Sequence, residues 1–275
     1  MSESNKNIIS PSQLNKIINN NQLKIIDCRW YINNKKKGRE EYNKGHIPGA
    51  IYFDLEKNSD PNNHIPHMLP KKEKFLSFLK KNGITPDDDI VIYDQSGYFC
   101  SSRVWFTFTY YDFKNIKILN GGIKYWNDHN YEVSGKKKTT LIKKKIHLKE
   151  KKIMVANHEY VKRKIKDKKT LIIDARPRSR FLGLEEEPRK NLKKGNIPGS
   201  INIPFTSLFD KKGRFLNKSI LKKRFEKEIN FTFVKEIICT CGSGVTACNI
   251  IFGLNLLGVQ NLKLYDGSWA EWGKK

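Results

Sequence analysis

The chain carries one pattern of residues twice, and this internal repeat is the feature that most limits its fold. The first copy reads LKIIDCR at 23–29 and KGHIPGAI at 44–51. The second copy reads LIIDAR at 171–176 and KGNIPGSI at 194–201. In each copy an apolar strand ends in Asp, and a polar stretch then leads to a Pro-Gly turn and another strand. The repeat predicts two domains that share one fold.

The later part of each copy corresponds as well. DIVIYD at 89–94 matches EIICTC at 236–241, and ILNGGIKYW at 118–126 matches LYDGSWAEW at 264–272. Short apolar strands that alternate with helical stretches are typical of parallel α/β sheets. We therefore predict the α/β class, with two tandem domains that are each a parallel sheet flanked by helices.

The segment between the two copies differs from both in composition. It is rich in Lys and poorly periodic, which is the character of a linker. We predict a first domain at 8–135, a Lys-rich linker at 136–153 and a second domain at 154–275.

The sequence composition indicates in which cellular compartment the protein is expected. No apolar run approaches the ~20 residues of a membrane span, and the first residues resemble neither a secretory signal nor a transit peptide. Five Cys is an odd number, and their irregular spacing favours a reducing environment over a disulfide framework. These features predict a cytoplasmic protein with no membrane partner.

A formal net charge of +25 is typical of proteins that bind nucleic acid, so nucleic acid has to be considered as a partner. The excess is nearly all Lys in loops, Arg is scarce by comparison, and no nucleic-acid-binding signature occurs. We interpret the charge as a field that attracts small anionic substrates, and we do not expect nucleic acid to be a partner.

One cysteine stands at a turn suited to chemistry. Cys241 opens the run CGSGVT, which follows an apolar strand and precedes a segment with the apolar rhythm of a helix. Backbone N–H groups at such a turn, together with the positive end of the helix dipole, stabilise an anionic sulfur. The first copy has Asp94 at this position and no matching thiol, so we predict that the first domain is not catalytic.

With these motifs, the chain resembles the tandem rhodanese-domain sulfurtransferases over essentially its whole length. The run CGSGVT is similar to the 3-mercaptopyruvate sulfurtransferase branch, because Gly242 and Ser243 are neutral. Thiosulfate sulfurtransferases of this family typically carry two cationic residues there. The resemblance implies that the Cys241 thiolate takes sulfur from 3-mercaptopyruvate, holds it as a persulfide and releases pyruvate.

The resemblance also implies which residues bind the donor. Arg180 and Arg189 match the two substrate-binding arginines of the family, and a guanidinium suits bidentate capture of a carboxylate. The alternative is that each Arg pairs with a Glu of 185–187 on the surface. The resemblance further implies that the loop residues Gly242, Gly244, Val245 and Thr246 form the cradle for the transferred sulfur.

Some members of this branch place a Ser-His-Asp relay beside the cysteine. The matching positions are Ser243, His67 and Asp60, which in this role would activate the substrate thiol or protonate the enolate. The alternative is a polar loop with no catalytic part. Neither a metal nor an organic cofactor is implied, and the sulfur acceptor is expected to be a thiol such as thioredoxin or a small dithiol, or cyanide.

Single residues of the sequence argue against some other functions, and two alternatives stay open. A cysteine phosphatase loop needs Arg where this chain has Ala247. Cys239 and Cys248 are poorly placed as resolving thiols, and His46 is interpreted as structural because the second copy has Asn196 there. A thiosulfate-preferring sulfurtransferase and a non-catalytic rhodanese binding module remain the alternatives.

Overall fold

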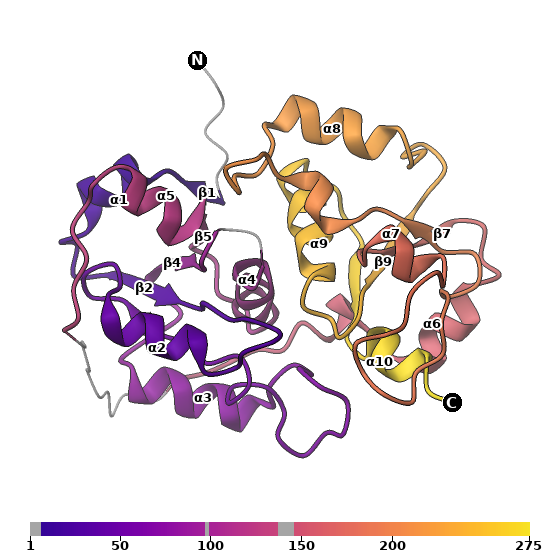
Figure 1. Ribbon diagram of the computed structural model, residues 1–275, viewed down its shortest axis with the longest axis horizontal. Helices are drawn as coiled ribbons and strands as arrows, with labels where there is room; N and C mark the ends of the chain where they lie inside the picture. Colours follow the sequence, from indigo (N-terminus) through magenta and orange to yellow (C-terminus); the bar gives the residue numbers. More distant parts are fainter. Residues whose placement is uncertain (1–6, 97–98, 137–145) are drawn as a thin grey trace. The chain divides into compact units, whose positions relative to one another are not determined.

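The computed structural model describes residues 7–96, 99–136 and 146–275 (Figure 1). The chain divides into two compact units, of which the first comprises 1–61, 69–151 and 211–215. The second unit comprises 62–68, 152–210 and 216–275. Much of the predicted linker, residues 137–145, lies outside the described residues, as do 97–98 in the loop after Asp94.

The first unit is built on a parallel sheet with the strand order β1-β5-β4-β2-β3. Its central strands are nearly continuous apolar runs, as expected for strands that are covered on both faces. Tyr93, at the end of one central strand, is opposite Asp27, at the end of its neighbour. The strands are β1 (Ile8–Ile9), β2 (Leu23–Asp27), β3 (Ile51–Tyr52), β4 (Asp89–Tyr93) and β5 (Ile116–Leu119).

The helices of the first unit follow its strands in alternation. The first of them has a capping box, in which Ser10 and Gln13 each bond to the backbone of the other. The most apolar of them is buried along most of its length, because its Trp and Phe side chains lie in the core. The helices are α1 (Pro11–Ile17), α2 (Lys37–Lys44), α3 (Lys72–Lys81), α4 (Ser101–Tyr110) and α5 (Gly122–Asp128).

The second unit repeats this sheet, with the order β6-β10-β9-β7-β8 and all pairs parallel. Thr240 is opposite Asp174, as Tyr93 is opposite Asp27 in the first unit. The predicted fold class is therefore confirmed for both copies of the repeat. The strands are β6 (Val155–Ala156), β7 (Thr170–Asp174), β8 (Ile201–Asn202), β9 (Glu236–Thr240) and β10 (Leu262–Tyr265).

The helices of the second unit include one that is apolar on nearly every side and buried along its length. It follows β9 directly, so its N-terminus stands at the carboxyl edge of the sheet, where ligands bind in parallel sheets. The helices are α6 (His158–Lys164), α7 (Arg178–Phe181), α8 (Lys218–Glu226), α9 (Ala247–Leu256) and α10 (Ser268–Trp272), with short 3-10 turns η1 (Lys152–Met154) and η2 (Phe205–Leu208).

An Asp-x-Arg triplet ends the same strand in both units and is structural. Arg29 bonds to Asp27 and to the carbonyl oxygen of Gly45, and Arg176 bonds in the same way to Asp174 and Gly195. Each guanidinium therefore links a strand end to the turn before the Pro-Gly pair. His46 is fully buried, and its two ring nitrogens contact the carbonyl oxygens of neighbouring residues, which agrees with a structural role.

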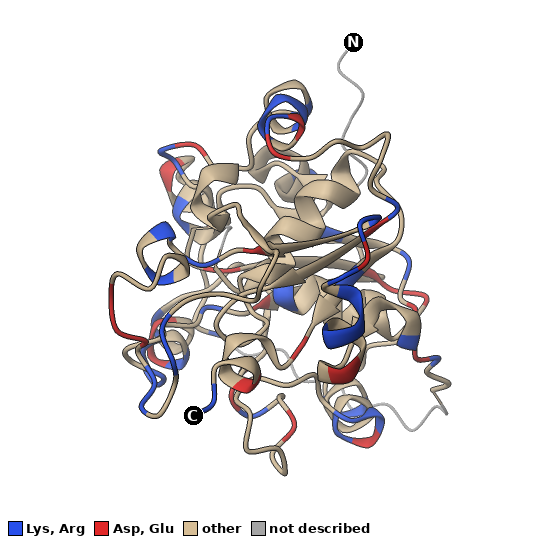
Figure 2. Cartoon of the chain, turned by 90° about the vertical axis from the view of Figure 1, so that its right-hand side faces the viewer, with Lys and Arg blue, Asp and Glu red and all other residues tan. Residues whose placement is uncertain are grey.

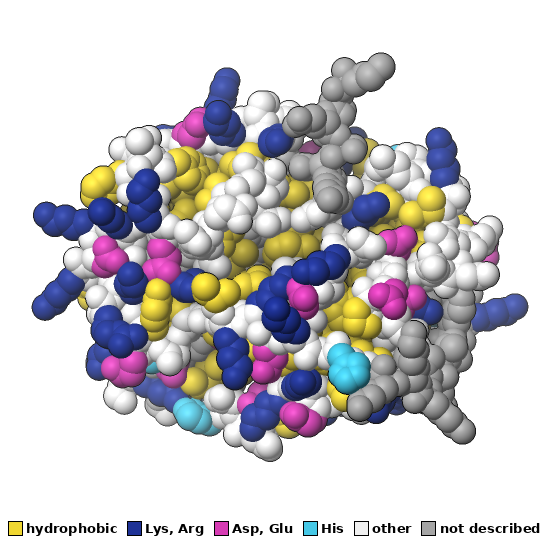
Figure 3. Space-filling view, turned by 180° about the vertical axis from the view of Figure 1, so that it is seen from behind, with side chains coloured by type: hydrophobic (Ala, Val, Ile, Leu, Met, Phe, Trp, Pro, Cys, Tyr) yellow, Lys and Arg dark blue, Asp and Glu magenta, His cyan; other side chains and the backbone are white. Residues whose placement is uncertain are grey.

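Charged residues are spread over helices and loops, and some also lie in the strands, among them Lys117 in β5 and Lys263 in β10 (Figure 2). On the face shown in Figure 3, Lys and Arg side chains are scattered, with Asp and Glu between them. This distribution gives a diffuse positive field. Among the described residues, no helix is long and apolar enough to cross a membrane.

Candidate active site

Cys241 is the first residue after β9, and backbone and side-chain contacts fix its position. Its N–H donates to the hydroxyl of Ser268 at 3.2 Å, and its carbonyl oxygen accepts from the N–H of Trp269 at 2.9 Å. The residue is 2% exposed. The nucleophile candidate therefore stands on two neighbouring strand ends of one rigid sheet, because Ser268 and Trp269 open α10 directly after β10.

Ser268 itself has a left-handed backbone, with φ of 50°. This conformation costs a non-glycine residue about 1 kcal/mol, and its hydroxyl donates to the carbonyl oxygen of Tyr265 at 2.8 Å. The matching residue of the first unit is Gly122, with φ of 60°. Sequence reasoning missed Ser268, although the alignment of the repeats with Gly122 marks a position of unusual backbone geometry.

The loop after Cys241 turns sharply into α9. Gly244 has φ of 73°, which favours glycine, and its carbonyl oxygen accepts from the thiol of Cys248 at 3.2 Å. Val245 is buried, and Thr246 occupies the N-cap position of α9. The loop is therefore held from both ends, by the sheet at Cys241 and by the first turn of the helix.

The two thiols nearest in sequence to Cys241 are fully buried. Cys239 is fully buried within β9, and burial, followed by the nearby thiols of Cys248 and Cys241, raises its pKa well above the usual value. A raised pKa leaves little reactive thiolate near neutral pH. The Cys248 thiol is also fully buried and donates to a carbonyl oxygen.

Both predicted substrate arginines lie beside Gly242. A Cβ atom built at this glycine would be 3.2 Å from Nη2 of Arg180 and 3.6 Å from Nη1 of Arg189. The glycine therefore gives the two guanidinium groups the room to approach the loop directly after Cys241. A long cationic side chain at this position would meet the two cations that are already there.

A buried carboxylate orients Arg180. Glu187 contacts Arg180 through both of its oxygens and also accepts from Nη1 of Arg176 at 2.6 Å. The Glu187 side chain is 2% exposed and that of Arg180 is 14% exposed. The pairing that we considered as the alternative role of Arg180 thus exists, but it is buried and not on the surface. Among the described residues, this pairing uses Nε and Nη2 of Arg180 and leaves its Nη1 group for another partner.

The Arg176 guanidinium is the second cation that Glu187 contacts. It is buried, pairs with Asp174 and Glu187, and stacks at 4.3 Å from the ring centroid of Trp269. These contacts give Arg176 a structural role. Arg178 is exposed. Glu187 was not singled out, because three successive Glu residues differ only in burial, which the sequence does not show.

Ser243 meets two of the predicted residues. Its hydroxyl is 2.9 Å from Nδ1 of His67 and accepts from Nη2 of Arg189 at 3.3 Å. His67 and Ser243 are both buried, and His67 has a left-handed φ of 62°. The segment that contains His67 groups with the second unit, so the structure brings Ser243, His67 and Arg189 together around the loop after Cys241.

Asp60 groups apart from the segment that contains His67. It is half-buried and belongs to the first unit. Its predicted place behind His67 in a relay remains a prediction.

The first unit shows what stands in place of the thiol. Asp94 follows β4 as Cys241 follows β9, and its Oδ2 atom accepts from the N–H groups of Phe99, Cys100 and Ser101 at 2.8, 2.8 and 3.0 Å. Its Oδ1 atom accepts from the N–H of Ser96 at 3.0 Å. A carboxylate of the chain itself therefore occupies the position at which an anion would bind in this loop.

Comparisons with known proteins agree with this geometry. The family model of the rhodanese-like domain matches residues 10–129 and again 157–275. A thiosulfate/3-mercaptopyruvate sulfurtransferase of Arabidopsis thaliana is 35% identical, with 96% of this chain and 75% of the relative covered. The 3-mercaptopyruvate sulfurtransferase of Escherichia coli strain K12 is 33% identical, with 94% of this chain and 92% of the relative covered.

A solved structure agrees over the same length. The crystal structure of SseA from Escherichia coli superimposes with a TM-score of 0.84 at 30% identity and covers 96% of this chain and 99% of that one. The fold and the loop at Cys241 define an enzyme of the transferase class, a sulfurtransferase built from two rhodanese-like domains. The chain belongs to the family of tandem rhodanese-domain sulfurtransferases, and its predicted likeness to the 3-mercaptopyruvate sulfurtransferase branch is confirmed.

Proposed function

We propose that Cys241 takes the sulfur of 3-mercaptopyruvate. The thiolate attacks the substrate sulfur, an S–S bond forms, and the carbon–sulfur bond breaks with its electron pair on carbon. The carbon fragment leaves as the enolate of pyruvate, which takes up one proton, and Cys241 retains a persulfide. The position of Cys241 at a strand end before a buried helix supports this role, because the N–H groups of residues 242–246 can stabilise the terminal sulfur.

The position of the two arginines beside Gly242 is the observation that carries the choice of donor. We assign the carboxylate of 3-mercaptopyruvate to Arg180 and Arg189, with the adjacent carbonyl oxygen polarised by the same cations. The donor anion is then held away from its sulfur, so that Gly242 and Ser243 need no charge of their own. Thiosulfate carries its charge next to the transferable sulfur, so we expect this arrangement of arginines to bind it less well.

The proton for the enolate is assigned to Ser243 and His67. The 2.9 Å contact between Ser243 Oγ and His67 Nδ1 supports a proton path from the imidazole through the hydroxyl. Asp60 is proposed as the residue that orients His67. Arg189, which donates to the same hydroxyl, fixes the direction of the serine side chain.

A thiol acceptor completes the turnover. The acceptor thiolate attacks the outer sulfur of the persulfide, the S–S bond to Cys241 breaks, and the enzyme thiolate returns. A reduced thioredoxin or a small dithiol is the acceptor we propose, with cyanide as a laboratory substitute that yields thiocyanate. All five cysteines are free, which supports a reducing compartment, the cytoplasm.

We assign this chemistry to the second domain, residues 154–275. The first domain, residues 8–135, is proposed to be non-catalytic in that it has no nucleophile of its own, because Asp94 replaces the nucleophile and its carboxylate accepts bonds from its own loop. His67 lies in the segment 62–68, which groups with the second unit. The segment 136–153 is proposed as the linker.

The test is pyruvate formation from 3-mercaptopyruvate with dithiothreitol as acceptor, alongside thiocyanate formation from thiosulfate and cyanide. Cys241→Ser is expected to remove pyruvate formation, whereas Cys248→Ser retains turnover within a few-fold of the wild type. Intact-mass analysis after exposure to donor alone should show one added sulfur, located on the peptide that contains Cys241. Equal melting temperatures of the variants establish that folding is intact.

Two results would contradict the proposal. A higher kcat/KM for thiosulfate than for 3-mercaptopyruvate would overturn the donor assignment and keep Cys241 as the nucleophile. Absence of turnover and of added sulfur with both donors would indicate a binding module instead of an enzyme.

A further inference from the structure

A cavity in the first unit concentrates cationic side chains that the sulfurtransferase site does not use. It has a volume of about 380 Å³ and lies between α2, the edge strand β3, the loop after it and α3. This volume is within the range of ligand sites for small molecules, roughly 300–1,000 Å³. No residue of the candidate active site lines it. Its polar lining is formed by Arg39, Asp54, Lys57, Asn58, Lys74, Ser77, Lys81 and Asn82.

The charge of this cavity is strongly unbalanced. Four cationic side chains line it and one carboxylate, that of Asp54. Asp54 lies 3.8 Å from Nη2 of Arg39 and accepts from the backbone N–H of Lys57 at 3.2 Å. Within the described part of the chain, the structure gives no ion pair for the ammonium groups of Lys57, Lys74 and Lys81. Three positive charges therefore surround the cavity without a counter-charge.

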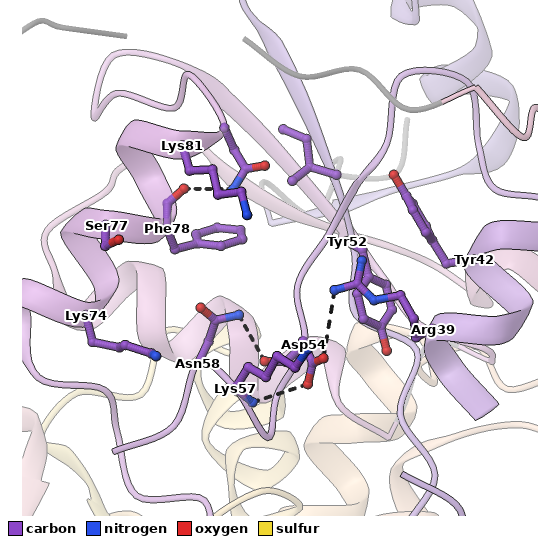
Figure 4. A pocket seen from close by; sticks show the side chains of 12 residues that line it. Arg39, Tyr42, Tyr52, Asp54, Lys57, Asn58, Lys74, Ser77, Phe78 and Lys81 are labelled. Atoms are coloured by element: carbon purple, nitrogen blue, oxygen red, sulfur yellow. Dashed lines mark hydrogen bonds and ion pairs between the residues drawn. The ribbon is translucent and has the colours of Figure 1, made fainter. Parts of the chain in front are cut away.

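The walls between these cations are aromatic. Figure 4 shows the Phe78 ring on one side of the space and Tyr52 on the other, with Arg39 lying over the tyrosine ring. The guanidinium carbon of Arg39 is 4.0 Å from the ring centroid, within the range of a cation–π interaction. Lys74 and Lys81 are seven residues apart on α3, so they project from the same face two turns apart.

This combination selects a ligand class. A single carboxylate needs one cation, whereas several lysines and an arginine around one cavity suit an ion with several negative charges, and phosphate groups are bound in this way. The aromatic walls suit an organic group attached to the phosphates. We propose that this cavity binds a small organic polyphosphate of the size of a nucleoside di- or triphosphate.

The test is isothermal titration of the full-length protein with ATP at about 150 mM salt, where long-range attraction to exposed charges is largely screened. The matched variants lie on one helix. Lys74→Gln/Lys81→Gln removes two charges that line the cavity, and Lys72→Gln/Lys80→Gln removes two exposed charges of α3 that do not line it. We expect 1:1 binding to the wild type, at least tenfold weaker binding to the first variant, and a change below twofold in the second.

Further ligands separate the parts of the proposal. Adenosine should bind at least tenfold more weakly than ATP, because the lysines contact phosphate. Tripolyphosphate that binds as tightly as ATP would overturn the role of the aromatic walls. Equal weakening by both double variants would overturn the site, since it would indicate attraction to the overall charge. Tighter binding of a single-stranded oligonucleotide through the same lysines would replace the small ligand with nucleic acid.

Turnover of 3-mercaptopyruvate without added nucleotide should be unchanged in both double variants. A loss of turnover in Lys74→Gln/Lys81→Gln alone would place these lysines in the sulfurtransferase machinery and contradict a separate site.

Discussion

Glu187 is the residue that determines how Arg180 is presented to a substrate. Its carboxylate holds two guanidinium groups in a buried position, and hydrogen bonds to charged groups contribute about 1.5–3 kcal/mol each. We predict that Glu187→Gln raises KM for 3-mercaptopyruvate about tenfold and changes kcat less, because the neutral amide orients Arg180 less well. Steady-state kinetics of purified protein measure both parameters.

The neighbouring Glu186→Gln is the control for this substitution. Its side chain is 78% exposed and pairs with Lys194, so the same chemical change there should leave KM within twofold. An unchanged KM in Glu187→Gln would contradict the positioning role. A fall in kcat with constant KM would move the role of Glu187 from substrate binding to the chemical step.

Ser268 has a strained, left-handed backbone, and its hydroxyl accepts a hydrogen bond from the N–H of Cys241. Ser268→Ala keeps the left-handed backbone and loses the hydroxyl, so we expect it to lower the free energy of unfolding by about 1–2 kcal/mol. Ser268→Gly also loses the hydroxyl but removes the strain, so its stability should stay within about 0.5 kcal/mol of the wild type. Urea denaturation measures both values.

Activity separates the two functions of Ser268. Both variants should lose pyruvate formation to a similar degree, because Cys241 loses the same backbone contact in each. If Ser268→Gly were as active as the wild type, the hydroxyl would have no part in placing the nucleophile.

Among the elements, the described residues between β4 and α4 bond to the carboxylate of Asp94. Asp94 is fully buried and accepts from four backbone N–H groups. We predict that Asp94→Ala lowers the free energy of unfolding by about 3 kcal/mol, because buried donors lose a charged acceptor. Asp89→Ala, at the exposed start of the same strand, should change it by less than about 0.5 kcal/mol. Similar values for the two variants would contradict this role of Asp94.

The elements that the sequence predicts are those with long patterns. The strands around Ile25, Ile92, Ile172 and Ile238 are apolar runs, and the repeat assigns each its counterpart. The two-residue strands β1 and β6 are too short to show a period, so their pairing comes only from the structure. The turns at the Pro-Gly pairs are predicted by their residue types.

The site is less predictable than the fold, because long-range contacts form it. His67 reaches Ser243 across 176 residues of sequence, with a left-handed backbone that no local pattern indicates. It was found through the family resemblance alone. Glu187 is one of three successive Glu residues, and only its burial between Arg176 and Arg180 distinguishes it.

At the scale of the whole molecule, we expect the excess of positive charge to raise the rate at which an anionic donor meets the protein. The net charge is +25, and on the face shown in Figure 3 the Lys and Arg side chains are scattered. A diffuse positive field attracts anions, and salt shortens the range of this attraction. The screening length falls from about 30 Å at 0.01 M ionic strength to about 8 Å at 0.15 M. The field raises the rate of encounter and leaves the chemical step unchanged.

We therefore predict that kcat/KM for 3-mercaptopyruvate falls about three- to tenfold between ~20 and ~300 mM sodium chloride, while kcat changes by less than about twofold. Saturating dithiothreitol, a neutral acceptor at pH 7, keeps the second half-reaction constant, and sucrose at matched osmolarity controls for effects other than screening. A parallel fall in kcat would mean that salt acts on the chemistry at Cys241. A flat kcat/KM would mean that the local charges of Arg180 and Arg189 bind the donor without help from the lysines.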